Sequence, residues 1–391
     1  MKNTTQQQIK IGSSTYTVSE SNGRLRVRLW DSRQQKQVNV YGKTLAELRP
    51  KVKAKLAEFN EELQLSTNRN VEQYFDYWLK NYKFNVLKQT TYDRLERTIR
   101  TLIVPYIGSI KMRAVTSDDI QKVYEAVAEE HAYSTIKKVH EALNGCFKHA
   151  YLMGDIAKNP MTVAKPPREQ NVKKQTKEIQ VYTDIEIKRL VSTIDKEWKE
   201  NKYFRVAPIF VLMLNTGLRV GEALALRHED INLENKTLSV NHTLSKVSIR
   251  DKNKNSVSKT EYILAEPKTK TSKRTIDLNS KAIEALEEEH NRNIEKGLGY
   301  SQFVFCSEEL NHFTQRSLED TLKRLCVRAN IPYYGIHALR HTFVSRCFSK
   351  GIPIEVISEL VGHSSVNVTR DVYLHIMPEQ KRSAIELLEA I

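Results

Sequence analysis

Residues 337–341 read His-Ala-Leu-Arg-His, residues 360–365 read Leu-Val-Gly-His-Ser-Ser, and a tyrosine follows at position 373. On a helix, His337, Arg340 and His341 occupy positions i, i+3 and i+4 and therefore share one face. A guanidinium beside imidazoles is typical of a phosphate site, and a nearby tyrosine is a candidate nucleophile. A core helix with polar surface residues would give the same spacing, so this stretch alone leaves both interpretations open.

The same stretch predicts two short helices. Proline is tolerated in the first turn of a helix, so Pro353 fits the start of the second helix, and glycine often follows the last turn, so Gly362 fits its end. Leu339, Phe343 and Cys347 recur every four residues, which predicts a buried stripe on a second face of the first helix.

The composition favours a polyanionic partner. The chain has 391 residues, enough for two or three domains, and a net charge of +15 from 62 Lys and Arg against 47 Asp and Glu. Nucleic acid fits this excess better than an anionic membrane surface. The four cysteines form no Cys-x-x-Cys pair, which argues against a zinc site or a disulfide framework and favours a reducing, cytosolic setting. Residues 1–11 lack the pattern of a signal peptide, and the most apolar run, 206–214, is too short to span a bilayer.

Residues 1–66 predict a three-stranded sheet followed by a helix. Asn22-Gly23 is a strong signal for a hairpin turn. In the strand over 24–30, alternation places apolar residues on one face and Arg24, Arg26 and Arg28 on the other. This basic face suits phosphate contacts or entry into a major groove, although a solvated strand face is the alternative.

Residues 67–164 predict an all-helical module with one basic edge. The second helix opens at Lys88, where main-chain N–H groups and threonine hydroxyls suit phosphate oxygens. Basic residues recur at spacing three on its polar face, which a solvated helix would also show. The candidate nucleic-acid contacts of this module are Lys88, Thr90, Thr91, Arg94, Arg97 and Arg100. An exposed basic linker is predicted over 165–178, because the segment has two prolines and no apolar periodicity, and Lys173 and Lys174 are further candidate contacts.

The remaining chain, 179–391, predicts alternating helices and short strands. A strongly apolar helix stops at Asn215-Thr216-Gly217, and the next helix begins beside Arg219, where the helix dipole and N–H groups favour anions. A strand near 237–240, a lysine-rich hairpin over 246–274 and helices near 280–296 and 314–329 follow.

Four blocks now stand in order: Thr-Gly-Leu-Arg-Val-Gly-Glu at 216–222, Thr-Lys-Thr at 269–271, His-Ala-Leu-Arg-His-Thr at 337–342, and Leu-Val-Gly-His-Ser-Ser at 360–365 followed by Tyr373. Together they resemble the tyrosine recombinase family of the phage-integrase type, and the resemblance extends over most of the chain. It implies a multi-domain, mainly α fold with small β-sheets. The implied parts are an arm-type DNA-binding domain (1–66), a helical core-type DNA-binding domain (67–164), a basic linker (165–178) and a mixed α/β catalytic domain (179–391).

The resemblance also implies a role for each site residue. Arg219 and Arg340 would clamp the scissile phosphate, and Tyr373 would attack it to give a 3′-phosphotyrosine. Lys270 would protonate the leaving 5′-oxygen, with Lys268 and Lys273 as alternatives. The remaining implied roles are acid/base chemistry for His337, a phosphate hydrogen bond for His363, and support for Glu222 and His341. No metal and no cofactor is implied, since two arginines can stabilise the developing charge.

The implied activity is site-specific recombination that integrates and excises a mobile element through a Holliday junction. A chromosome-dimer resolvase and a catalytically silent DNA-binding protein are alternatives. A metal hydrolase using His337 and His341 is disfavoured, because the glutamate which that pattern needs is replaced by Ala338. The N-terminal sheet favours an integrase similar to those of Gram-positive phages and conjugative transposons.

The partners implied are double-stranded DNA and further copies of the chain in a tetramer. An excisionase and a host DNA-bending protein are additional candidates, and the implied location is the bacterial cytoplasm, at the nucleoid when the protein is active. Residues 378–391 predict an amphipathic helix that would dock on a neighbouring protomer or, alternatively, pack within its own chain.

Overall fold

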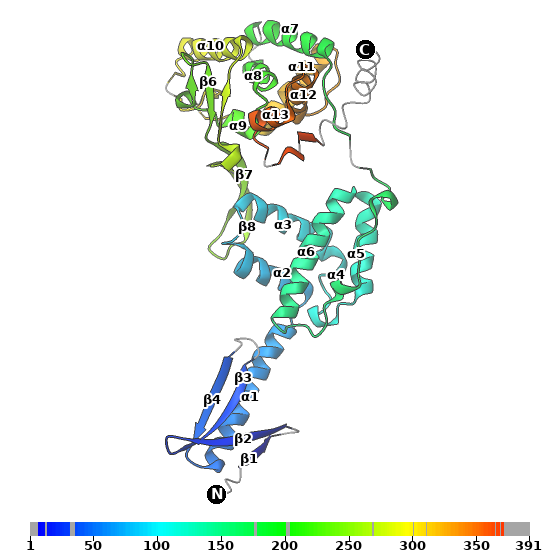
Figure 1. The fold of residues 1–391 in the computed structure, drawn as a ribbon, viewed down its shortest axis with the longest axis vertical. Helices are drawn as coiled ribbons and strands as arrows, with labels where there is room; N and C mark the ends of the chain where they lie inside the picture. Colours follow the sequence, from blue (N-terminus) through cyan, green and yellow to red (C-terminus); the bar gives the residue numbers. More distant parts are fainter. Residues whose placement is uncertain are drawn as a thin grey trace, which may run out of the picture. The chain divides into compact units, whose positions relative to one another are not determined.

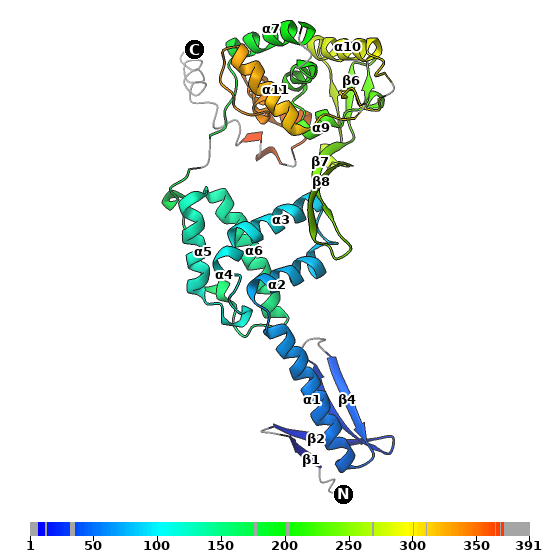
Figure 2. The same cartoon turned by 180° about the vertical axis from the view of Figure 1, so that it is seen from behind.

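The computed structural model describes residues 7–11, 14–31, 36–175, 178–200, 204–267, 270–299, 301–309, 311–363, 365–367 and 369–370. The chain divides into two units (Figures 1 and 2). Unit 1 comprises Met1–Thr176 together with Arg250–Val257, and unit 2 comprises Lys177–Ile249 together with Ser258–Ile391.

The N-terminal part of unit 1 is an antiparallel sheet with one helix. Its strands pair in sequence order: β1 (Gln8–Ile11), β2 (Ser14–Ser21), β3 (Arg24–Asp31) and β4 (Lys36–Gly42). Helix α1 (Leu45–Thr67) follows them. The predicted turn at Asn22-Gly23 is confirmed, with φ of 51° and 69°. The three predicted strands correspond to β2, β3 and β4. The sheet has a fourth strand that was not predicted, β1, whose four residues are too few to give a clear pattern and bury Ile9 most fully.

The predicted faces of β3 are confirmed. Val27 and Leu29 are buried and belong to a core cluster with Leu48 and Val52 of α1. Arg24 and Arg28 are exposed on the other face. Arg26 is half-buried there, and its Nε donates to Ser19 Oγ at 3.3 Å.

The rest of unit 1 is helical, as predicted. It contains α2 (Val71–Trp78), the π-helical turn η1 (Leu79–Lys83), α3 (Gln89–Leu102), α4 (Val104–Ile107), α5 (Ser117–Glu130) and α6 (Tyr133–Leu152), with 3-10 turns η2 (Met112–Ala114), η3 (Pro160–Thr162) and η4 (Glu169–Asn171). Its separate core buries large aromatic side chains, among them Tyr74, Phe75, Tyr124 and Phe147. Reciprocal side-chain caps fix the starts of α2 and α5, at Asn70 and Thr116.

The tip of a hairpin completes unit 1. Strands β7 (Thr243–Arg250) and β8 (Ser256–Ala265) pair with each other. Residues 250–257, which form the turn between the strands and the adjoining strand ends, belong to unit 1. Arg250 Nη2 donates to the Asp93 carboxylate and, at 2.7 Å, to Glu96 Oε2 of α3. Its guanidinium lies 4.5 Å from the centre of the Tyr92 ring, and only 6% of its side chain is exposed. The lysine-rich hairpin therefore carries a buried arginine.

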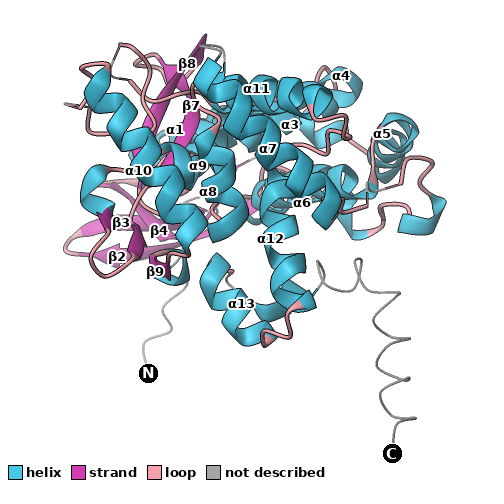
Figure 3. Ribbon diagram, turned by 90° about the horizontal axis from the view of Figure 1, so that it is seen from above, coloured by secondary structure: helices cyan, strands magenta, loops and turns pink. Residues whose placement is uncertain are grey.

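Unit 2 is built around α8 (Pro208–Thr216), which is buried along nearly its whole length. The other helices are α7 (Asp184–Glu200), α9 (Val220–Leu224), α10 (Ser280–Glu295), α11 (Gln315–Arg328), α12 (His337–Ser349) and α13 (Ile354–Val361), with 3-10 turns η6 (His228–Asp230) and η7 (Lys270–Ser272). A small antiparallel sheet has the order β5 (Ile231–Asn232), β6 (Thr237–Val240), β9 (Arg274–Asp277). Helices α12 and α13, both predicted, pack side by side (Figure 3).

Gly217 seats the end of α8 against these two helices. It has φ +66°, a left-handed conformation that favours glycine. A Cβ at this position would lie 2.5 Å from the Phe343 ring and 3.1 Å from Val361. The close approach brings the segment 216–222 to α12 and to the end of α13, although more than a hundred residues separate them in sequence. Within the part of the chain that the structure describes, no helix has both the length and the apolarity needed to cross a membrane.

Candidate active site

Arg340 joins the ends of two helices. Its Nη1 donates to the carbonyl of Gly217, after α8, and its Nη2 donates to the carbonyl of Val361, at the end of α13, both at 2.7 Å. The side chain comes from the first turns of α12, and only 4% of the residue is exposed. Burial and the nearby charge of Arg219 lower the pKa of Arg340, so this guanidinium is placed where an anion would stabilise it.

Arg219 is the N-cap residue of α9 and is held by Glu222 and Gly362. Its Nη1 donates to Glu222 Oε1 at 2.7 Å, and its Nη2 donates to the Gly362 carbonyl at 3.0 Å. The i, i+3 ion pair is therefore present, and it orients the arginine. About a third of the side chain, 34%, is exposed, so Arg219 is more accessible to a ligand than Arg340.

Glu222 links Arg219 to a third arginine that the sequence analysis missed. Arg274 Nη2, at the start of β9, donates to Glu222 Oε2 at 3.0 Å. Burial raises the pKa of the Glu222 carboxyl, but the charges of Arg274 and Arg219 outweigh burial and hold this pKa below its usual range. The sequence signal for Arg274 was weak, because it follows a run of lysines and such runs are usually solvated.

The cluster carries excess positive charge. Three guanidinium groups, of Arg219, Arg274 and Arg340, face one carboxylate, of Glu222, which leaves a net charge of +2 if the nearby imidazoles are neutral. A half-buried centre with this charge favours binding of an anion, and the planar guanidinium matches the oxygens of a phosphate.

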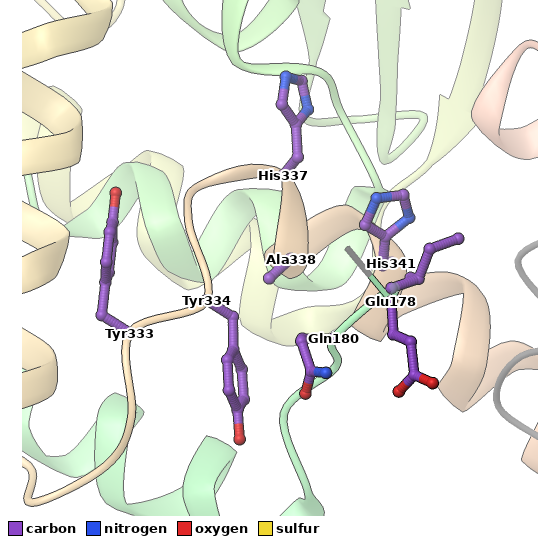
Figure 4. Close-up of a pocket in the computed structure, with 8 residues that line it drawn as sticks. Glu178, Gln180, Tyr333, Tyr334, His337, Ala338 and His341 are labelled. Atoms are coloured by element: carbon purple, nitrogen blue, oxygen red, sulfur yellow. The ribbon is translucent and has the colours of Figure 1, made fainter. Parts of the chain in front are cut away.

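His337 and His341 share one face of α12, as predicted, and line one cavity. The cavity has a volume of about 630 Å³ and is also lined by Tyr333, Tyr334 and the segment 178–180 (Figure 4). Burial, followed by the charges of Arg340 and Arg219, lowers the pKa of His337. Burial and His337 lower the pKa of His341 to about 4. Both rings are thus neutral near pH 7 and can accept or relay a proton.

His363 follows Gly362, the C-cap residue of α13. Burial and the charges of Arg340 and Arg219 lower the pKa of its imidazole to about 3. Its Nδ1 lies 2.7 Å from Thr369 Oγ1, which fixes the ring orientation. A neutral imidazole held in this way offers a hydrogen bond rather than a charge to a ligand.

Lys270 lies on the turn η7, which corrects its predicted place on the hairpin. The hairpin ends with β8 at Ala265, and the chain then turns into β9, which pairs with β6 instead. The carbonyl of Thr271 lies 3.0 Å from where a Cβ on Gly362 would stand, so the turn lies against the end of α13. Lys273 Nζ lies 3.5 Å from the exposed carboxylate of Glu266.

Several predicted features lie outside the described residues: the nucleophile Tyr373, the helix over 378–391, Lys268 and the side chain of Lys270. In the described ranges, no group of three or more His, Cys, Asp or Glu side chains could hold a metal ion.

The predicted DNA contacts differ in their surroundings. Arg94 and Arg97 are exposed on α3, and Arg94 also lines a second cavity, of about 340 Å³, with Lys83 and Lys138. Lys88 is exposed just before α3, whereas Thr90 and Thr91 are half-buried in its first turn. Arg100 forms ion pairs with Asp76 and Glu96 at 3.1 and 3.2 Å.

The lysines of the predicted linker contact α5. Lys173 pairs with the Glu129 carboxylate, and Lys174 Nζ donates to the Glu130 carbonyl at 3.1 Å. The neighbouring Val172 is buried in the helical core of unit 1.

Known proteins resemble this chain in both sequence and fold. Residues 180–380 match the model of the phage integrase family, and residues 70–127 match the phage integrase N-terminal SAM-like domain. A tyrosine recombinase XerC-like protein of Caldanaerobacter subterraneus subsp. tengcongensis is 35% identical over 292 residues, which cover 71% of this chain and 72% of the relative. The probable integrase of prophage ps2 of Lactococcus lactis is 27% identical, covering 88% of this chain and 87% of the relative.

Two solved structures show the same fold. The Tn1549 transposon integrase in complex with transposon right end DNA has a TM-score of 0.65 and 25% identity, covering 82% of this chain and 100% of that chain. A lambda integrase tetramer bound to a Holliday junction has a TM-score of 0.56 and 15% identity, covering 89% of this chain and 95% of that chain. The match over 180–380 and the XerC-like relative place this chain in the phage integrase family, and it is a tyrosine recombinase.

Proposed function

We propose that this recombinase integrates and excises a mobile element by cleaving and rejoining DNA at the arginine cluster of unit 2. The observation that carries the proposal is the net charge of +2 of Arg219, Arg274, Arg340 and Glu222 beside neutral histidines. The similarity to a prophage integrase and to a transposon integrase bound to transposon end DNA supports the mobile element as substrate.

In the first step, the Tyr373 oxygen attacks the scissile phosphorus and the bond to the 5′-oxygen breaks. The product is a 3′-phosphotyrosine and a free 5′-hydroxyl. The transition state concentrates negative charge on the phosphoryl oxygens, and the guanidinium groups of Arg219 and Arg340 stabilise that charge because they are already oriented by protein carbonyls.

Two proton transfers accompany the step. A phenol has a pKa of about 10, so Tyr373 needs a base near neutral pH, and the neutral His337 accepts its proton. Lys270 protonates the leaving 5′-oxygen, and its position on the turn against α13 supports this role. His363 donates a hydrogen bond to the phosphate, whereas Glu222 orients Arg219 and His341 supports α12.

Rejoining reverses these steps with a different strand. The 5′-hydroxyl of a partner strand attacks the phosphotyrosine, so the energy of the phosphodiester is retained and ATP is not needed. Four copies of the chain would exchange strands in pairs through a Holliday junction, as the tetramer in the lambda integrase structure suggests. An excisionase and a host DNA-bending protein are proposed as further partners.

DNA is proposed to contact three basic regions. They are the arginine face of β3, the start and polar face of α3, and the lysines at 173–174, that is Arg24, Arg26, Arg28, Lys88, Thr90, Thr91, Arg94, Arg97, Arg100, Lys173 and Lys174. Phosphate contacts of this kind fix position on the duplex without reading sequence. The N-terminal sheet would hold arm sites and the helical module core sites, over 1–66 and 67–164.

The proposal is tested on the element that carries the gene. Sequencing across its two ends supplies the junctions, which are placed on one plasmid. The plasmid is incubated with the protein and a dialysed extract of cells that carry the element, which supplies an excisionase and a DNA-bending protein, in EDTA and without ATP. The expected product is an excised circle with joined ends, detected by amplification across the new junction. The proposal would be contradicted if excision required a divalent metal. It would also be contradicted if the protein bound the junction DNA but formed no circle. Direct repeats bounding the element would separate an integrase from a chromosome-dimer resolvase.

A further inference from the structure

We propose that Arg274 is a positioning residue for the cleavage reaction. It orients Arg219 through Glu222 and ties the turn that carries Lys270 to the end of α13. The inference rests on the proposed function of the arginine cluster, and it adds a residue that none of the four sequence blocks contains.

The first argument is the set of contacts that Arg274 makes. Its Nε donates to the Leu360 carbonyl at 2.7 Å, its Nη2 donates to Glu222 Oε2 at 3.0 Å, and its Nη1 donates to the Ser272 carbonyl at 3.3 Å. Each of its three nitrogens therefore has a protein partner, and only 5% of the side chain is exposed. These bonds direct Arg274 toward Glu222, the end of α13 and the turn η7, so we assign it a role that acts through these residues.

The second argument is the position of the acceptors. Three successive carbonyls at the end of α13, of Leu360, Val361 and Gly362, accept hydrogen bonds from Arg274, Arg340 and Arg219 respectively. The last carbonyls of a helix lack intrahelical partners and carry the negative end of its dipole. One helix end thus fixes all three arginines, which come from β9, α12 and the start of α9.

The third argument is electrostatic. Glu222 is buried and shared by Arg219 and Arg274. Without Arg274, the carboxylate would have Arg219 as its remaining partner among these contacts, and the charge of the cluster would fall from +2 to +1. Arg219 would then be more strongly neutralised and less effective in stabilising a phosphorane. Arg274 therefore contributes to catalysis without touching the reacting atoms.

The test compares Arg274→Met with the wild type on a nicked duplex that spans one element end. The measured quantities are the rate of the covalent protein–DNA adduct and the affinity for the duplex. We expect adduct formation to slow by about 10- to 100-fold, the effect of losing one charge-assisted hydrogen bond at a buried group, with affinity nearly unchanged. Arg316→Met, an arginine on α11 with 89% of its side chain exposed, is the matched control and should react like the wild type.

A second substrate separates positioning from mere loss of structure. A methylphosphonate at the scissile position replaces one charged oxygen by a methyl group and makes the reacting centre neutral. The defect of Arg274→Met should shrink on this substrate, because less positive charge is needed there. Equal defects on both substrates, or wild-type rates for Arg274→Met, would overturn the inference. If Arg274→Met does not fold, Arg274→Lys is compared with the wild type on both substrates, because lysine keeps the charge but lacks the planar guanidinium. We expect adduct formation by Arg274→Lys to slow less than is predicted for Arg274→Met, and this slowing to be smaller on the methylphosphonate.

The two proposals fail differently. If the wild type binds the element end but forms no adduct with either substrate, the proposed function is wrong. If the wild type forms the adduct and the Arg274 variants match it, only the role of Arg274 is wrong.

Discussion

Gly362 occupies a position that favours glycine for two reasons. Its φ is +64°, and a Cβ there would lie 3.0 Å from both Arg274 Nη1 and the Thr271 carbonyl. Its own carbonyl holds Arg219. This one residue therefore ends α13, makes room for Arg274 and the Lys270 turn, and orients the more accessible arginine.

Replacement of Gly362 by alanine should affect activity more than stability. The left-handed conformation costs about 1–2 kcal/mol for a residue with a Cβ, and the collision with Arg274 adds a displacement inside the site. Gly351→Ala is the control, since Gly351 has φ +75° and nothing in the described residues lies within 4 Å of its Cβ position. Thermal unfolding should drop similarly in both variants, whereas adduct formation should fall only in Gly362→Ala. Equal activity losses would contradict this account.

His341 should make the stability of unit 2 depend on pH. Burial lowers the pKa of its imidazole from 6.5 to about 4, with His337 and Arg340 adding to the effect. Above pH 6.5 the ring is neutral in the folded and unfolded chains. Between pH 6.5 and 4 the unfolded chain binds a proton that the folded chain does not, so stability falls as the pH falls.

Chemical denaturation of wild type and His341→Asn between pH 4 and 8 measures this contribution. The variant should lose less stability than the wild type on going from pH 7 to pH 5. Identical pH profiles would show that His341 is not the group responsible, since His337 and His363 also have lowered pKa values.

At the scale of single elements, the tip of the β7–β8 hairpin depends on one arginine. Arg250 is nearly buried and faces Asp93 and Glu96, whose side chains are each 10% exposed. Arg250→Ala would remove the ion pair with Asp93 and would leave Glu96 paired with Arg100. We expect this change to lower the free energy of unfolding of unit 1 by about 3–5 kcal/mol.

Hydrogen–deuterium exchange of the full chain tests this prediction. The peptides over 250–257 and α3 should exchange faster in Arg250→Ala than in the wild type. Arg97→Ala is the control, because Arg97 is exposed on the same helix. Unchanged exchange over 250–257 would mean that the ion pairs do not hold the hairpin tip.

The elements that sequence patterns predicted best are those with local signals. Asn22-Gly23 turns between β2 and β3, and Gly217 and Gly362 end helices, as expected. The misses are elements held by distant partners. Strand β1 buries little of its own, and β9 leaves the hairpin because β6 is available for pairing, which no local pattern records.

The same distinction explains which site residues could be predicted. Arg219, Arg340 and the histidines stand in blocks whose order along the chain is informative. Arg274 is defined by contacts with Glu222 and Leu360, at sequence separations of 52 and 86 residues. Only the folded chain reveals that its charge is buried rather than solvated.

For the molecule as a whole, the charge of +15 is distributed over parts with different tasks. The basic faces of β3 and α3 in unit 1 are exposed, whereas three arginines of unit 2 are gathered around one carboxylate. Exposed charges attract and position a polyanion, and oriented, half-buried charges stabilise a transition state. We propose that the second group serves a nucleophile from the C-terminal part of the chain, and that this nucleophile is Tyr373.

The most direct test of this claim is a covalent adduct. A nicked duplex spanning one element end loses its short 5′-hydroxyl fragment after cleavage, so the 3′-phosphotyrosine cannot be resealed and accumulates. Wild-type protein should give a protein–DNA species that survives denaturing electrophoresis in the presence of EDTA, and mass spectrometry should locate the DNA on Tyr373. Tyr373→Phe should bind the duplex with unchanged affinity and give no adduct. An adduct that forms equally with Tyr373→Phe would show that another residue attacks the phosphate.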